Sequence, residues 1–238
     1  MQQIIMSQRI ESSMYEEYYQ EYCNEVHKTL GAYLFWKMIQ NRAVSEPELL
    51  SAINNTPLSW IMIRHALQVT LFITLGRIFD ADGNSFSADV LLKCCVEEID
   101  IFSKDNLRNR KIKQQKGKTP DWLEEYISGA YAPTRTDFHK LRGELSKHRK
   151  VFEEIYRPIR HKIFAHTDKE FMGKVDQLWA ATNIGQLENI IWFLNDLKLT
   201  LFETYENGRP PLLQNKTPDI DFYQRDYASL LDIVKKTL

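Results

Sequence analysis

The chain has 238 residues, of which 43% are apolar and 26% are charged, and its formal net charge at pH 7 is −1. This composition is typical of a globular protein and excludes a disordered one. With only 9 glycines and 8 prolines, the composition also disfavours collagen-like, low-complexity and turn-rich all-β proteins. The length permits one large domain or two small ones.

The helices predicted from the sequence follow one another along nearly the whole chain, because apolar residues recur at helical spacing. Ser45 and Ser87 are suited to cap two of these helices, and Pro47 and Pro57 stand where two helices begin. No alternating apolar stretch is long enough for a strand. In chain order, the predicted helices cover residues 7–40, 46–54, 58–79, 88–99, 122–127, 136–166, 184–205 and 225–236.

These elements predict an all-α protein, a helical bundle with an up-and-down core of four to five helices and extra short helices. We expect one domain over residues 1–238, with a C-terminal arm over residues 206–238 packed on it. The helix at 58–79 is apolar on most faces, which predicts a place at the centre of the domain. The basic segment 104–118 either binds a polyanion or forms a solvated helix connection.

Localisation follows from what the chain does not contain. Three cysteines, two of them adjacent, predict no disulfide framework, and no CxxC spacing suggests zinc. The N-terminal residues are too polar for a signal peptide. The apolar stretch 58–79 contains Arg64, His65 and Arg77, so we do not expect it to span a membrane. A cytoplasmic protein without a membrane partner is the resulting expectation.

The usual catalytic and nucleotide-binding motifs are absent. There is no GxSxG, no GxxxxGK[ST] or GxGxxG loop, and no HExxH or di-iron pattern, so we predict neither a cofactor nor a metal site. The segment that remains is YRPIRHKIFAHTD at residues 156–168, which places Arg160 six residues before His166. Arg142 and His148 repeat this spacing, but their polar, glycine-containing interval is typical of a solvated helix face.

Arg160 to His166 resembles the R-x(4–6)-H motif of the HEPN superfamily, with His161 as the polar residue that follows the arginine. RHKIFAHTD is similar to the abortive-infection AbiU-like branch, and LGRIFD at residues 75–80 fits the same branch. The resemblance implies a small helical bundle that dimerises and acts as a metal-independent ribonuclease in toxin–antitoxin, phage-defence or RNA-processing systems. In HEPN toxins controlled by AMP transfer, a tyrosine follows the histidine by two positions. Because Asp168 stands there, we expect any antitoxin to bind by surface complementarity.

Cleaving RNA without metal requires proton transfer at the 2′-hydroxyl and 5′-oxygen and charge stabilisation at the phosphate. Histidine transfers protons near neutral pH, and arginine presents a charged planar fork to phosphate oxygens. His166 and Arg160 supply this pair and predict a 2′,3′-cyclic phosphate and a 5′-hydroxyl. On a straight helix the two side chains are roughly 120° and roughly 9 Å apart. We therefore expect Pro158 to interrupt the helix and a homodimer to form a composite site.

Supporting roles are predicted for five further residues. His161 and Lys162 are candidates for phosphate contact, and Asp168 for orienting the catalytic histidine. Arg77 and Asp80, at positions i and i+3, form a local pair or support the site.

Each assignment has a structural alternative. Arg160 is also placed to pair with Glu153 or Glu154 on its own helix, and His166 to stabilise a helix C-terminus. The alternative function is a non-catalytic helical module that binds RNA, a nucleotide or a protein partner. A purely structural dimer is a further possibility.

Overall fold

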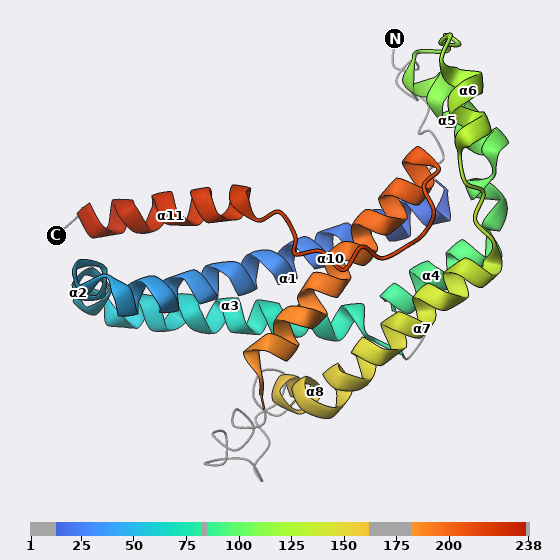
Figure 1. Cartoon of the computed structure of the whole chain (residues 1–238). Coiled ribbons are helices and arrows are strands. Elements are labelled where there is room, and N and C mark those ends of the chain that lie inside the picture. Colours follow the sequence, from blue (N-terminus) through green and yellow to red (C-terminus); the bar gives the residue numbers. More distant parts are fainter. Residues whose placement is uncertain (1–12, 82–84, 162–181, 237–238) are drawn as a thin grey trace, which may run out of the picture.

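The computed structural model describes residues 13–81, 85–161 and 182–236 (Figure 1). Every regular element within these ranges is a helix, which confirms the all-α prediction. The elements are α1 (Met14–Ser45), α2 (Pro47–Asn55), α3 (Pro57–Ile78), α4 (Ala88–Glu97), the 3₁₀-helix η1 (Ile99–Phe102), α5 (Lys104–Gln114), α6 (Leu123–Gly129), α7 (Arg135–Val151), the π-helix η2 (Phe152–Tyr156), α8 (Arg157–Ile159), α10 (Ile184–Asn207) and α11 (Asp221–Lys236).

The long helix α1 is the axis of the molecule and packs against α3, α4, α10 and α11. Its N-terminus is fixed by a capping box in which Ser13 and Glu16 bond to each other's backbone N–H groups. Three tyrosines on α1 then donate hydrogen bonds to main-chain carbonyls of α10. Tyr15, Tyr19 and Tyr22 bond to the carbonyls of Leu201, Lys198 and Leu194 at 3.3, 3.0 and 2.9 Å. These tyrosines therefore belong to the α1–α10 contact.

The basic segment 104–118 is largely helix α5, and its two arginines make contacts within the molecule. The guanidinium of Arg110 lies 3.9 Å from the ring centroid of Tyr205 and donates to the carbonyls of Ile101 and Tyr205. Arg108 pairs with Asp105 at 2.7 Å and with a carboxylate of α6 at 3.0 Å. Part of the charge of this segment thus serves to hold α5 against α6, η1 and α10.

Helix α3 differs from its prediction. The sequence predicts that the helix at residues 58–79 lies at the centre, but this is wrong for its first half. Leu58, Ile61 and Met62 are 77, 58 and 64% exposed, and the outer face becomes buried only from Leu71 onward. Apolar composition alone does not tell which faces of a helix other elements cover. Helix α3 is also long and apolar enough to cross a membrane, as core helices of soluble proteins can be.

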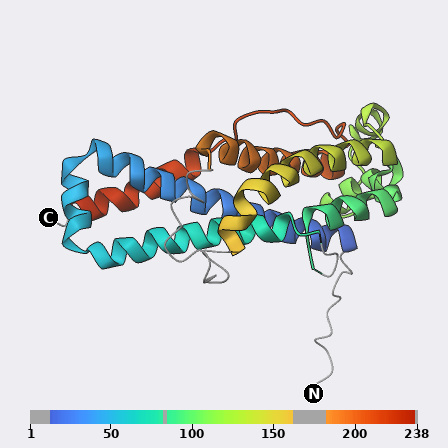
Figure 2. The ribbon, with the colours of Figure 1, turned by 90° about the horizontal axis from the view of Figure 1, so that it is seen from below.

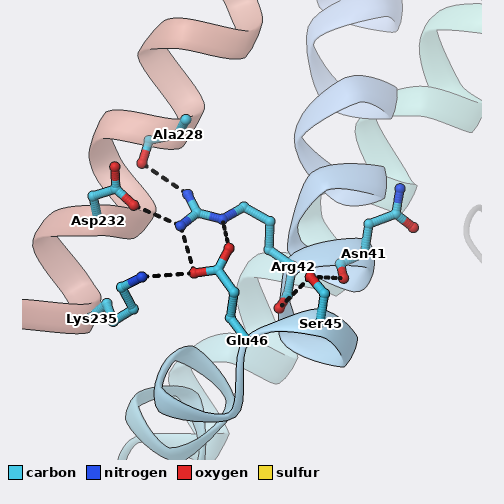
Figure 3. Close-up of polar contacts among 7 residues, drawn as sticks. All are labelled: Asn41, Arg42, Ser45, Glu46, Ala228, Asp232 and Lys235. Carbon is cyan, nitrogen blue, oxygen red and sulfur yellow. Dashed lines mark hydrogen bonds and ion pairs between the residues drawn. The ribbon is translucent and has the colours of Figure 1, made fainter.

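The last helix, α11, packs back along the C-terminal half of α1 and against α2 (Figures 1 and 3). Arg42 of α1 lies at the centre of the contact, 2.6 Å from carboxylate oxygens of both Glu46 and Asp232, and it donates to the carbonyl of Ala228 at 3.1 Å. Lys235 reaches Glu46 at 3.0 Å. Ion pairs thus bind α11, next to a small apolar contact in which Leu231 is fully buried.

We expect the docking of α11 to weaken in acid. Hydrogen bonds from Arg42 and Lys235 lower the pKa of Glu46 from 4.5 to about 2. Because the folded-state pKa is lowered, the carboxylate stabilises docking fully above pH 4.5, and this contribution is lost as the pH falls toward 2. Amide hydrogen exchange of residues 221–236, corrected for intrinsic rates, should therefore accelerate below pH 4.5.

The control is Glu46→Gln, which cannot titrate at this position. Its α11 should exchange faster at pH 6 and should show a weaker dependence on pH between 4.5 and 2. If wild type and Glu46→Gln lose α11 protection along the same pH curve, Glu46 is not the group responsible.

Candidate functional site

The helix that carries Arg160 is interrupted before it reaches that residue. The sequence predicts a helical stretch over residues 136–166 that Pro158 interrupts. In the structure α7 already ends at Val151 and is followed by the π-helix η2 and the single turn α8. A π-turn contains an extra residue, so side chains beyond it are rotated by about 100° relative to an unbroken α-helix. Pro158 lies within α8, where it has no N–H to donate. This irregular turn directs Arg160 toward α3.

The side chain of Arg160 lies directly on Gly76 of α3. A Cβ atom at position 76 would lie 2.8 Å from Cζ of Arg160 and nearer still to its Nε and Cδ atoms. Contacts this short do not occur between real side chains, so the arginine can occupy this place only because residue 76 is glycine. The LGRIFD element and the R-x5-H segment therefore meet at this contact, where Gly76 leaves room for Arg160.

A pocket of about 270 Å³ opens beside this contact. The rings of Phe79 and Phe152 stack with centroids 5.2 Å apart and form part of its wall. The pocket joins the end of α3 to η2 and α8, two segments that are far apart in the sequence. Its lining consists of Gly76, Phe79, Asp80, Ala81, Phe152, Glu153, Arg157, Arg160 and His161.

Two guanidinium groups and one imidazole gather in this pocket. The Nε2 atom of His161 lies 3.4 Å from Nε of Arg157 and 3.4 Å from Nη1 of Arg160. Nε of Arg160 is buried and has no hydrogen-bond partner in the described part of the chain. Arginine side chains that converge in this way suit phosphate oxygens, which accept several charged hydrogen bonds at once.

Acidic groups accompany these cations, but they do not pair with Arg160. Asp80 and Glu153 both line the pocket, and Oδ2 of Asp80 accepts a hydrogen bond from Ser85 at 2.8 Å. Among residues 13–81, 85–161 and 182–236, no carboxylate lies within ion-pair distance of Arg160. The pairing with Glu153 or Glu154 that the sequence permits is therefore not formed.

Arg77 does not line the pocket. Its Nη1 atom lies 3.5 Å from Oε1 of Glu25, a carboxylate of α1 that is almost fully buried and is also 2.6 Å from Lys28. Arg77 thus connects α3 to α1, while Asp80 lies in the pocket. Of the expected supporting residues, Asp80 and His161 line the same pocket as Arg160.

The remaining predicted site residues, Lys162, His166 and Asp168, lie outside the described residues. Sequence reasoning missed Arg157 and Gly76, which the structure places in the pocket. Arg157 is three residues before Arg160, a spacing that puts two helical side chains on one face. A glycine inside an apolar helix indicates close approach of another group, which was the available signal for Gly76.

Metal ligands do not cluster in the described part of the molecule. Within those ranges, no group of three His, Cys, Asp or Glu side chains is placed to hold one metal ion. The chemistry available in the pocket is that of guanidinium, imidazole and carboxylate groups.

Comparison with known proteins places the chain in a family. The model of the HEPN AbiU2 family, described as AbiU2, matches residues 13–215, which is well over half of the chain. No curated protein and no solved structure matches it. The match contains both LGRIFD and the R-x5-H segment, and it ends before α11. The chain therefore belongs to the AbiU2 family of HEPN domains, the abortive-infection branch that its sequence resembles.

Proposed function

We propose that this protein is a metal-independent endoribonuclease of a phage-defence or toxin–antitoxin system. The observation that carries the proposal is the position of Arg160, held over Gly76 in a polar pocket and free of any described carboxylate partner. A guanidinium without a carboxylate partner can bind an anion, and such a site suits the phosphate of RNA.

In the proposed reaction, Arg160 binds and neutralises the scissile phosphate and His166 transfers the proton. Histidine takes the proton from the ribose 2′-hydroxyl, whose oxygen attacks the phosphorus. The bond to the 5′-oxygen breaks, and the leaving oxygen receives a proton from histidine. The products are a 2′,3′-cyclic phosphate and a 5′-hydroxyl, and no metal or cofactor takes part. Arg157 adds positive charge to the same pocket, and His161 adds an imidazole that forms hydrogen bonds with the arginines.

The proposal includes a homodimer that acts in the cytoplasm. A two-fold axis near the pocket would bring Arg160 and His166 of one chain to face those of its partner, so that one phosphate meets both pairs. An antitoxin, where one exists, would bind the surface of this dimer.

The test is RNA cleavage by the purified protein in EDTA. We expect Arg160→Ala and His166→Ala each to slow cleavage by about 100-fold or more, the usual effect of removing a group that stabilises charge or transfers a proton. Cleavage by wild type should change between pH 6 and 7, because histidine ordinarily titrates near pH 6.5. Analysis of the ends should find the cyclic phosphate and the 5′-hydroxyl.

Matched controls exist elsewhere in the chain. His139 is exposed on α7 and Arg225 is exposed on α11, so His139→Ala and Arg225→Ala should cut RNA as wild type does. If wild type binds RNA, a nucleotide or a protein but cuts no RNA in EDTA, the protein is a binding module and the nuclease proposal is wrong. Activity that stays constant from pH 5 to 9 would remove His166 from the proton transfer.

A further inference from the structure

The first half of α3 presents an uncovered apolar stripe. Leu58, Ile61 and Met62 are 77, 58 and 64% exposed, whereas Trp60, on the opposite face, is buried. In Figure 2, α3 runs along the lower edge of the molecule with α1 above it. Only 28% of the most apolar 18-residue stretch of this helix is buried. Large apolar side chains gathered on one face, unlike scattered ones, indicate a contact surface.

The stripe has the spacing of a coiled-coil seam. Its positions are four, three, four, three and four residues apart, which is the alternation of a and d positions in a heptad repeat. The last two positions are covered by the chain itself, since Tyr156 stacks on Phe72 at 6.3 Å and Arg160 lies on Gly76. The first four positions are exposed or half-buried. In order, the seam consists of Leu58, Met62, His65, Val69, Phe72 and Gly76.

We propose that a second copy of the chain packs on this stripe, with its α3 beside and parallel to the first. The orientation rests on the proposed function, which needs the two Arg160 side chains near each other. In a parallel pair the two Gly76 residues lie at the same height. In an antiparallel pair centred between Met62 and His65, they would lie about 38 Å apart along the helix axis at about 1.5 Å per residue.

The charges of α3 also suit pairing with a copy of itself. A parallel two-fold pair sets each seam residue against its own counterpart, so that any carboxylate, lysine or arginine there would meet a like charge. The four exposed or half-buried seam residues and Ile61 beside them include none of these groups. The nearest cation, Arg64, is turned toward α1, where two nitrogens of its guanidinium lie 2.7 and 2.9 Å from the side-chain amide group of Gln40, whose oxygen is assigned to face them.

The first experiment measures association without RNA. Wild type should be a dimer at micromolar concentration in sedimentation velocity, and Met62→Glu should dissociate at least tenfold more readily because two carboxylates would meet in the seam. Leu212→Glu is the matched control, since Leu212 is also 64% exposed but lies between α10 and α11; it should dimerise as wild type does. Circular dichroism checks that both variants remain helical.

The second experiment tests the orientation by oxidative cross-linking. Leu58→Cys and His65→Cys should each join to their own counterpart, which only a parallel pair allows for both positions. Wild type should not cross-link, because Cys94 and Cys95 are buried and Cys23 is partly buried. Cross-linking at only one of the two positions, or at neither, would overturn the parallel pairing.

Further outcomes separate this proposal from its alternatives. A wild-type monomer at every concentration, or Met62-dependent binding of wild type to phosphatidylcholine vesicles in place of dimerisation, would overturn it. Arg160→Ala should dimerise as wild type does, because Arg160 lies outside the uncovered stripe. If wild type dimerises through the stripe but cuts no RNA, the interface is right and the proposed function fails.

Discussion

Gly76→Ala is expected to lower the rate of RNA cleavage by about 100-fold and to leave the protein folded. The new methyl group would overlap the side chain of Arg160, which is flexible and moves more readily than α3. A displacement of about 1 Å in a catalytic group is enough for a loss of this size. The free energy of unfolding should change by no more than about 1 kcal/mol, because alanine favours the helix by about that amount. Cleavage assays and urea denaturation measure the two effects.

Gly143→Ala is the control for this substitution. Gly143 lies within α7, and a Cβ atom there would meet no heavy atom within 4 Å. This variant should cut RNA at the wild-type rate and gain about 0.5–1 kcal/mol of stability. If Gly76→Ala also cuts RNA at the wild-type rate, Arg160 does not act from the position that the structure gives it.

Tyr156→Ala is expected to cost about 3–5 kcal/mol of stability, as is usual when a large buried aromatic side chain is removed. Tyr156 is fully buried; its ring stacks on Phe72 of α3, and its hydroxyl donates to the carbonyl of Asn183 at 2.8 Å. Asn183 is also the N-cap of α10, where its side chain accepts from the backbone of Gln186. One side chain therefore joins η2, α3 and the start of α10.

One further variant separates the contribution of the hydroxyl from that of the ring, and another serves as a control at an exposed ring. Tyr156→Phe keeps the ring and loses only the hydrogen bond, so we expect a loss of about 1 kcal/mol. Phe222→Ala removes an aromatic ring that is 72% exposed and should change stability by less than about 0.5 kcal/mol. Urea denaturation measures the free energy of unfolding of all three variants. An unchanged free energy of unfolding in Tyr156→Ala would show that this ring does not hold the turn before Arg160.

Local signals in the sequence were enough to predict most of the helices and several of their ends, although helix α5 within the basic segment 104–118 was not among those predicted. Pro47 and Pro57 stand at the starts of α2 and α3 as expected, and Ser87 caps α4 by accepting from the backbone of Val90. Contacts between distant segments were not predictable in this way. The exposure of α3 depends on which helices reach its outer face, and apolar spacing carries no information about that.

The same limit applies to the candidate site. The motif identified Arg160 and His161, and Pro158 predicted an interruption of the helix before them, because these features are local. Gly76 was hidden inside the apolar stretch of α3, and its importance appears only when Arg160 is found resting on it. Conversely, Arg77 looked equivalent to Asp80 in the sequence, but its side chain turns toward α1.

Helix α11 has a practical consequence for making the protein. The stretch matched by the family model ends at residue 215, but Leu231 completes a small core together with Ile39, Leu49 and Trp60. A polypeptide shortened to that boundary would present those three side chains to water and would tend to aggregate. Expression vectors should therefore retain the final helix, and a purification tag is better placed at the N-terminus than beside Lys235.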